Sequence, residues 1–85
     1  MGELTKLPNI GEALEGQLQA VGIEDEAALR AVGAEQAWLR IQGIDASACI
    51  HRLLALEGAI QGVKKAALPE ERKAALRAFY RAHKL

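Results

Sequence analysis

The sequence is poor in the residue types on which exported and membrane proteins depend. It contains one cysteine, Cys49, among 85 residues, so no intrachain disulfide can form. A domain this small without disulfides is typical of a reducing compartment. The opening letters, MGELTKLPN, include an early acid and a proline instead of an apolar signal segment, and no stretch approaches the ~18 apolar residues that cross a bilayer. We therefore expect a cytoplasmic protein that has no contact with membranes.

The sequence also lacks the residue patterns of metal, nucleotide and catalytic sites. A closed zinc site needs four ligands, whereas Cys49 and His51 lie about 200° apart on a predicted helix and only His83 could add a third. No P-loop, dinucleotide-binding fingerprint or catalytic triad is present. Cys49 is interpreted as a small core residue, and Trp38 as an anchor of the core. We predict no catalytic residue, metal or cofactor, and hence no enzyme.

Alanine and leucine dominate the residues that are present. The chain holds 17 Ala and 12 Leu against ten β-branched residues. Alanine and leucine favour helices, whereas β-branched residues favour strands. The length suffices for one domain. We therefore predict an all-α protein with a single domain over residues 1–85 and a core over about 4–83.

Glycines divide the chain into segments whose apolar residues recur at helical spacing. Asp25 and Asp45 are predicted to cap two of these helices, because an aspartate carboxylate accepts hydrogen bonds from free amides at a helix start. Gly58 lies inside the longest helix and indicates a close helix crossing there. The expected fold is a compact bundle of about five short helices, near residues 11–20, 26–32, 35–42 and 46–61, with a last helix that has Pro69 in its first turn.

Charge is unevenly distributed although the net charge is zero. Residues 1–45 carry three basic and eight acidic side chains, whereas residues 46–85 carry eight basic and three acidic ones. A chain divided in this way could pair head to tail with a second copy, bind an acidic partner with its basic half, or neutralise itself within one fold. The sequence leaves these three alternatives open.

The stretch LPNIG, residues 7–11, predicts a tight turn that opens the first helix. Proline fixes φ, asparagine tolerates the left-handed conformation and glycine leaves room beside the backbone, so the first amides of the helix point outward. Such amides can bind a DNA phosphate, as in a helix-hairpin-helix. The candidate phosphate contacts in this region are Lys6, Asn9, Ile10 and Gly11.

Other residues of the same region argue for a purely structural turn. Asn9 stands where the hairpin usually has its first glycine. No Lys or Arg follows Gly11, and Glu12 and Glu15 would repel a phosphate. The expected backbone geometry of this stretch therefore favours phosphate binding, whereas its acidic side chains disfavour it.

The last helix carries a stripe of basic residues. Spacings of four, four and three place them on one side of the helix, where they could follow a nucleic-acid backbone or an acidic protein surface. The alternative is an ordinary solvated helix face, partly paired with Glu70. The stripe consists of Lys73, Arg77, Arg81 and Lys84.

A succession of short motifs covers about residues 4–81: LPNIG, VGI, LRAVGA, LEGAIQG and LPEERK, in that order. It resembles the C-terminal domain of the TfoX/Sxy family of bacterial competence regulators. The resemblance implies a compact helical domain of helix-hairpin-helix or SAM-like character, associated with the regulation of genes for DNA uptake and without catalytic residues. Full regulators of this family carry an N-terminal α/β domain ahead of this one. We therefore expect a free-standing short relative or a part that acts in trans.

Two functional hypotheses remain. In the first, the chain is a DNA-associated regulatory domain that makes weak, non-specific contacts with the backbone of duplex DNA. In the second, it is a SAM-like protein-interaction module that binds a transcription-regulatory protein or forms a homodimer, without direct DNA binding. The acidic first half and the basic last helix favour the second mechanism, and the family resemblance places either one in gene regulation.

Overall fold

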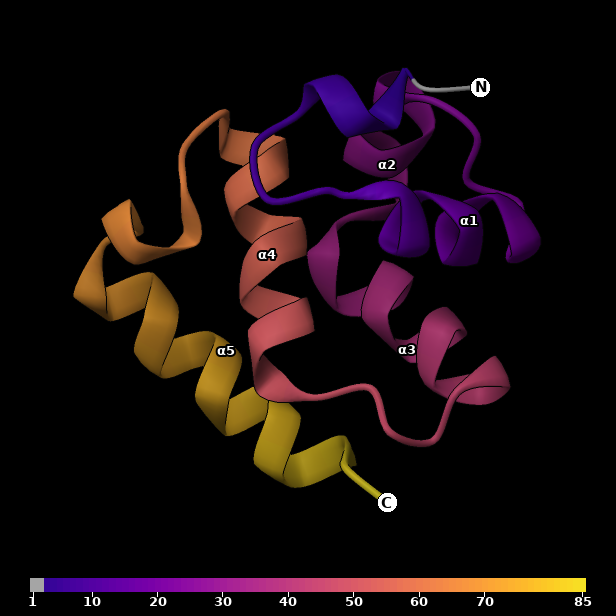
Figure 1. The fold of residues 1–85 in the computed structure, drawn as a ribbon. Helices are drawn as coiled ribbons and strands as arrows, with labels where there is room; N and C mark the ends of the chain where they lie inside the picture. Colours follow the sequence, from indigo (N-terminus) through magenta and orange to yellow (C-terminus); the bar gives the residue numbers. More distant parts are fainter. Residues whose placement is uncertain (1–2) are drawn as a thin grey trace.

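Helices supply the regular structure of residues 3–85, which the computed structural model describes (Figure 1). Within this range no strand occurs, and no helix is both long and apolar enough to cross a bilayer. The prediction of an all-α bundle of five short helices is confirmed. The elements are the 3₁₀ turn η1 (Leu4–Lys6), α1 (Glu12–Ala20), α2 (Glu26–Val32), α3 (Ala34–Ile44), α4 (Ile50–Gln61), the 3₁₀ turn η2 (Lys65–Ala67) and α5 (Glu70–His83).

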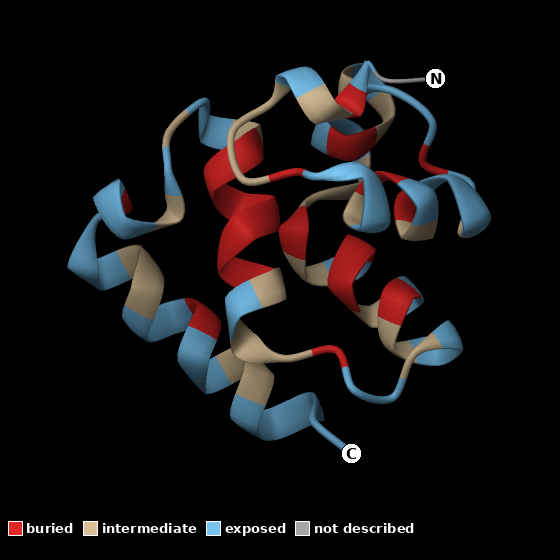
Figure 2. Ribbon diagram, in the orientation of Figure 1, coloured by how far each residue is buried: buried red, intermediate tan, exposed pale blue. Residues whose placement is uncertain are grey.

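Helix α4 is the centre of the fold. Seven consecutive residues, 53–59, are buried, so the helix is covered all round instead of along one stripe (Figure 2). It lies between α3 on one side and α5 on the other (Figure 1). The N-terminal half of the chain packs over its face toward α3, with Leu4, Leu18, Ile23 and Leu29 fully buried. The long apolar segment predicted in the sequence is therefore the core helix.

The predicted start of this helix is wrong. The sequence places it at residue 46 with Asp45 as the cap, whereas α4 begins at Ile50 behind Cys49. The Asp45 carboxylate accepts hydrogen bonds from the Ser47 backbone amide, at 3.0 Å, and from the Ser47 hydroxyl. A local side-chain turn of this kind competes with helix capping, so the chain bends over residues 45–48 before the helix starts.

The capping prediction for α2 is confirmed. The backbone amide of Ala28 donates to Asp25 Oδ1 at 2.8 Å, and the helix has the predicted bounds, 26–32. Gly33 follows with φ of 85°, a left-handed value that glycine adopts without steric cost. Helix α3 therefore starts directly behind α2.

Trp38 joins α3 to α5. Its side chain is fully buried, and its ring makes T-shaped contacts with those of Phe79 and Tyr80 at centroid distances of 6.2 and 5.6 Å. Its indole Nε1 donates to the carbonyl oxygen of Cys49 at 3.2 Å. The interpretation of Trp38 as a core anchor is confirmed, and its contacts with the two aromatic rings tie α5 to α3.

Gly58 is a point of close approach, as its position in α4 predicts, but the neighbours are not those of a helix crossing. A Cβ at this position would lie 2.7 Å from the carbonyl oxygen of Val63 and within clashing distance of Asn9 Nδ2. The turn of residues 7–11 and the segment after α4 therefore occupy the space beside Gly58.

An ion-pair bridge fastens α5 to the two helices beneath it. Arg72 of α5 donates to both carboxylate oxygens of Glu35 in α3, each at 3.0 Å, and to Glu57 Oε1 in α4 at 3.1 Å. Gln61 donates to the other oxygen of Glu57. Burial raises the pKa of Glu57, but the hydrogen bonds from Arg72 and Gln61 outweigh it, so the net pKa lies below its ordinary value. The buried carboxylate is therefore charged and paired in the folded protein.

We expect this bridge to make stability sensitive to acid. A carboxyl whose pKa is lowered on folding stabilises the protein above its unfolded pKa, 4.5 for glutamate, and the contribution is lost as pH falls through the folded value. Glu57→Gln should lower the free energy of unfolding near neutral pH by about 1–3 kcal/mol, because charge-assisted hydrogen bonds are lost. Urea unfolding near pH 7 and near pH 3 measures this effect. The variant should lose less stability than the wild type between the two pH values, and an equal loss would contradict the assignment.

Candidate nucleic-acid interface

The turn of residues 7–11 has the backbone that the sequence predicts. Asn9 has φ of 70° and is the one non-glycine residue with positive φ within residues 3–85. The amide of Ile10 donates to the carbonyl of Leu7 at 3.4 Å, which closes the turn. Gly11 is the N-cap of α1 in an extended conformation, and it has no side chain with which to cap. The turn therefore delivers the chain into α1 with an open helix end.

Three backbone amides at this helix end lack an acceptor within residues 3–85. The amides of Glu12, Ala13 and Leu14 have no acceptor in the part of the chain that the structure describes, and the first helical bond is made by Glu15 to the carbonyl of Gly11. Apart from its two chain neighbours, no described residue has an atom within 4 Å of a Cβ built at Gly11. Free amides and open space at a helix N-terminus favour a negatively charged ligand. The geometric part of the phosphate hypothesis is therefore present.

The side chain of Asn9 is turned into the fold. Its Nδ2 donates to the carbonyls of Val63, at 3.0 Å, and Ala55, at 3.4 Å, and its Oδ1 accepts from the Lys65 amide at 3.1 Å. An asparagine in place of the usual hairpin glycine thus ties the turn to the end of α4 and to η2. Only the backbone of Asn9 is left for a ligand.

Glu15 does not face the turn, contrary to the objection that the sequence raises. The residue is 8% exposed, and its Oε2 accepts from the amide of Leu4 at 3.0 Å. Its charge is therefore directed to the N-terminal segment, whereas Glu12 is exposed at the start of α1. Lys6 is exposed at the end of η1. Of the two predicted acids, Glu12 alone remains accessible beside the free amides.

The basic stripe of α5 is remote from the turn. Helix α5 lies across α4 from α1 (Figure 1). Lys73 is used within the fold, because its Nζ donates to the carbonyl of Ala66 at 3.0 Å. Arg77 and Arg81 are exposed and make no ion pair with any described residue, and Lys84 lies 6.0 Å from the centre of the Tyr80 ring. The exposed stripe therefore has three members, and the structure does not bring them to the turn.

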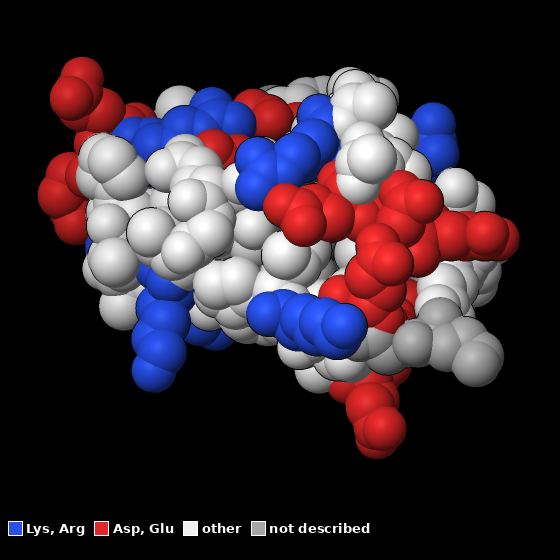
Figure 3. Space-filling model, turned by 90° about the horizontal axis from the view of Figure 1, so that it is seen from above, with Lys and Arg blue, Asp and Glu red and all other residues white. Residues whose placement is uncertain are grey.

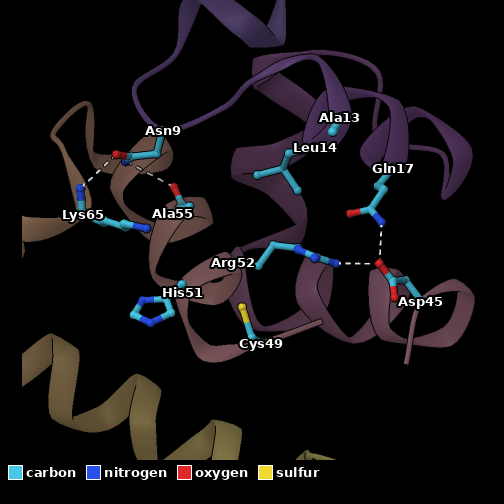
Figure 4. A pocket seen from close by; sticks show the side chains of 10 residues that line it. All are labelled: Asn9, Ala13, Leu14, Gln17, Asp45, Cys49, His51, Arg52, Ala55 and Lys65. Carbon is cyan, nitrogen blue, oxygen red and sulfur yellow. Dashed lines mark hydrogen bonds and ion pairs between the residues drawn. The ribbon is translucent and has the colours of Figure 1, made fainter. Parts of the chain in front are cut away.

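Sequence reasoning missed a groove that lies directly beside the turn (Figure 4). The groove has a volume of about 500 Å³ and runs along the front of α4, between α1 and η2. Its basic residues, His51, Arg52 and Lys65, come from sequence positions at least 40 residues after the turn. No local spacing signals such a cluster, because the hydrogen bonds of Asn9 bring the segments together. The groove is lined by Asn9, Ala13, Leu14, Gln17, Asp45, Cys49, His51, Arg52, Ala55 and Lys65.

Asp45 organises the far end of the groove. Its carboxylate accepts from the Ser47 hydroxyl, from Arg52 Nη1 at 2.9 Å and from Gln17 Nε2 at 2.9 Å. These hydrogen bonds hold the pKa of Asp45 well below its ordinary value, and the bond from Ser47 contributes most. The ionised carboxylate fixes the Arg52 side chain against α1 and offsets its charge.

The two halves of the chain neutralise each other in part. Arg72 pairs with Glu35, and Arg52 pairs with Asp45, so two cations of the second half are bound to acids of the first. Figure 3 shows many acidic side chains gathered on the right of the face seen from above, others at its left edge, and Lys and Arg side chains between them. The charge division in the sequence is therefore blurred on this face of the molecule.

Comparisons with known proteins relate the chain to one family. The sequence matches the family described as the TfoX C-terminal domain over residues 1–80. It is 44% identical over 70 residues to Protein Sxy of Escherichia coli (strain K12), an alignment that covers 82% of this chain and 34% of Sxy. The chain thus spans about a third of the length of this relative.

Two crystal structures of Listeria monocytogenes proteins have the same fold. An uncharacterized protein in a triclinic form matches with a TM-score of 0.92 at 43% identity, over 93% of this chain and 90% of that one. A protein of unknown function in a tetragonal form matches with a TM-score of 0.89 at 42% identity, over 92% of this chain and 96% of that one. In both matches the alignment covers nearly the whole of each chain.

Proposed function

Because the chain belongs to the TfoX C-terminal domain family, we propose that it is a non-enzymatic regulatory domain that acts in the cytoplasm on genes for competence and DNA uptake. Its mechanism is weak, sequence-independent contact with the backbone of duplex DNA. The observation that carries this proposal is the open N-terminus of α1, where the amides of Glu12, Ala13 and Leu14 have no acceptor within residues 3–85. Such amides favour phosphate oxygens and read no base sequence.

Binding to DNA should depend steeply on salt. If about three phosphates are contacted, the affinity falls roughly 40-fold between about 50 and about 200 mM salt, because each contact releases condensed counterions. Fluorescence anisotropy with a labelled duplex measures the affinity at each salt concentration. Two duplexes of unrelated sequence should bind equally. The absence of binding at the lower salt concentration would overturn the DNA mechanism.

Gly11→Asp separates binding from folding. The new carboxylate is expected to cap the free amides of α1 and raise the free energy of unfolding by a few tenths of a kcal/mol, since no atom crowds this position. It should also lower the affinity for duplex DNA, because it occupies the amides with a negative charge. Gly11→Ser is the matched control, which caps without charge and should lower affinity less. Urea unfolding of both variants verifies that the new side chain caps the helix. If both are capped and still bind DNA with unchanged affinity, these amides do not contact DNA.

A second candidate function is protein interaction through α5. Arg77, Arg81 and Lys84 are exposed on one helix, away from the turn, and could bind an acidic surface of a regulatory protein or of a second copy. Light scattering over a concentration series tests the second copy. If the chain forms a dimer, the measured mass should rise with concentration, and the double variant Arg77→Glu/Arg81→Glu should abolish the rise. A constant monomer mass would rule out self-association.

A further inference from the structure

The groove beside the turn carries two basic side chains that the described part of the fold does not engage. Lys65 and His51 line it, and neither side chain has an ion-pair or hydrogen-bond partner in residues 3–85. Figure 4 shows the Lys65 side chain running beneath Asn9 toward the groove, with His51 at the start of α4 below it. Lys65 contributes to the fold through its backbone amide, which donates to Asn9 Oδ1. Its ammonium group is therefore available to a ligand.

The groove is continuous with the open end of α1. Ala13 and Leu14 line it, and their backbone amides are among those without an acceptor in the described part of the chain. A ligand at these amides therefore has the groove as its neighbour on the side toward α4. One carboxylate, that of Asp45, also lines the groove, but it is engaged by Ser47, Gln17 and Arg52. The groove therefore keeps the Lys65 ammonium group and the His51 ring available to a ligand.

We propose that the groove receives a phosphate group of the nucleic-acid backbone next to the one held at α1, with Lys65 and His51 as its contacts. This inference rests on the proposed function, because it assigns a path across the protein surface to the DNA strand whose phosphate the amides of α1 bind. The strand crosses the front of α4 from the turn toward the start of that helix. It does not follow α5, since the exposed cations of α5 lie across α4 from the free amides.

Matched charge removals test this path. Lys65→Gln leaves the backbone bond to Asn9 in place and should weaken duplex binding about eightfold near 0.1 M salt. It should also reduce the salt slope by about 1. Arg81→Gln removes the same charge from an exposed position on α5 and should change neither quantity. The opposite pattern, with loss on Arg81→Gln and none on Lys65→Gln, would overturn the groove while leaving the DNA mechanism intact.

A second measurement tests the groove as a phosphate site even if the wild-type chain binds no duplex. The full chain labelled with ¹⁵N is titrated with pyrophosphate, and chemical-shift changes are mapped by nuclear magnetic resonance. Changes centred on His51 and Lys65 support the groove as a phosphate site even though the DNA mechanism has failed. The absence of changes, or changes confined to α5, would overturn the inference.

Discussion

Trp38→Ala should lower the free energy of unfolding by about 3–5 kcal/mol, the cost of truncating a large buried aromatic side chain. A domain of this length has a total stability of about 4–13 kcal/mol, so the variant should lose a large part of it. The effect is large because Trp38 is fully buried and contacts both Phe79 and Tyr80 of α5. Urea unfolding followed by far-ultraviolet circular dichroism measures it without depending on tryptophan fluorescence.

Trp38→Phe is the matched control for this prediction. Phenylalanine keeps an aromatic ring against α5 but loses the hydrogen bond from the indole Nε1 to the carbonyl of Cys49. That carbonyl still accepts from the amides of Arg52 and Leu53, so no buried acceptor is orphaned. The expected loss is therefore smaller, about 1–2 kcal/mol. A loss below about 1 kcal/mol for Trp38→Ala would contradict the role of Trp38 as the joint between α3 and α5.

Local signals in the sequence predicted the helices well where one interaction dominates. The bounds of α2 follow from the Asp25 cap and from Gly33, and both act within one turn of the helix end. Asp45 shows the limit of such signals. Its neighbour Ser47 offers a nearer donor than the helix amides do, and the start of α4 moves by four residues as a result. Two local interactions of similar strength cannot be ranked without the geometry.

The candidate site was predicted less completely, because its parts are joined by contacts that are distant in sequence. The turn and the open helix end were predictable from LPNIG, since φ preferences belong to individual residues. The inward direction of Glu15 and the bonds of Asn9 to Val63 and Lys65 were not, because each joins segments 11 to 56 residues apart. The basic groove exists only once those bonds bring η2 beside the turn. The stripe on α5 was visible in the sequence, but its distance from the turn was not.

Gly58→Ala should lower the free energy of unfolding by about 1–3 kcal/mol, although alanine is the better helix former by up to ~1 kcal/mol. The added methyl would meet the carbonyl oxygen of Val63 at 2.7 Å and the amide nitrogen of Asn9. Neither can move freely, because Asn9 Nδ2 is bonded to that carbonyl and Asn9 Oδ1 to the Lys65 amide. Gly16→Ala in α1 is the control, since its Cβ position is open, and it should raise stability by about 0.5–1 kcal/mol. Urea unfolding of the two variants should therefore give opposite signs.

The same substitution also tests how the turn is coupled to the groove. A methyl at Gly58 displaces the Asn9 side chain, and Asn9 holds both the left-handed turn and the backbone of Lys65 in place. Gly58→Ala should therefore weaken duplex binding under conditions where the variant is still fully folded, whereas Gly16→Ala should leave it unchanged. If Gly58→Ala is destabilised but binds with wild-type affinity, the turn and Lys65 tolerate the displacement of the Asn9 side chain. The position of Asn9 would then not determine the affinity for DNA.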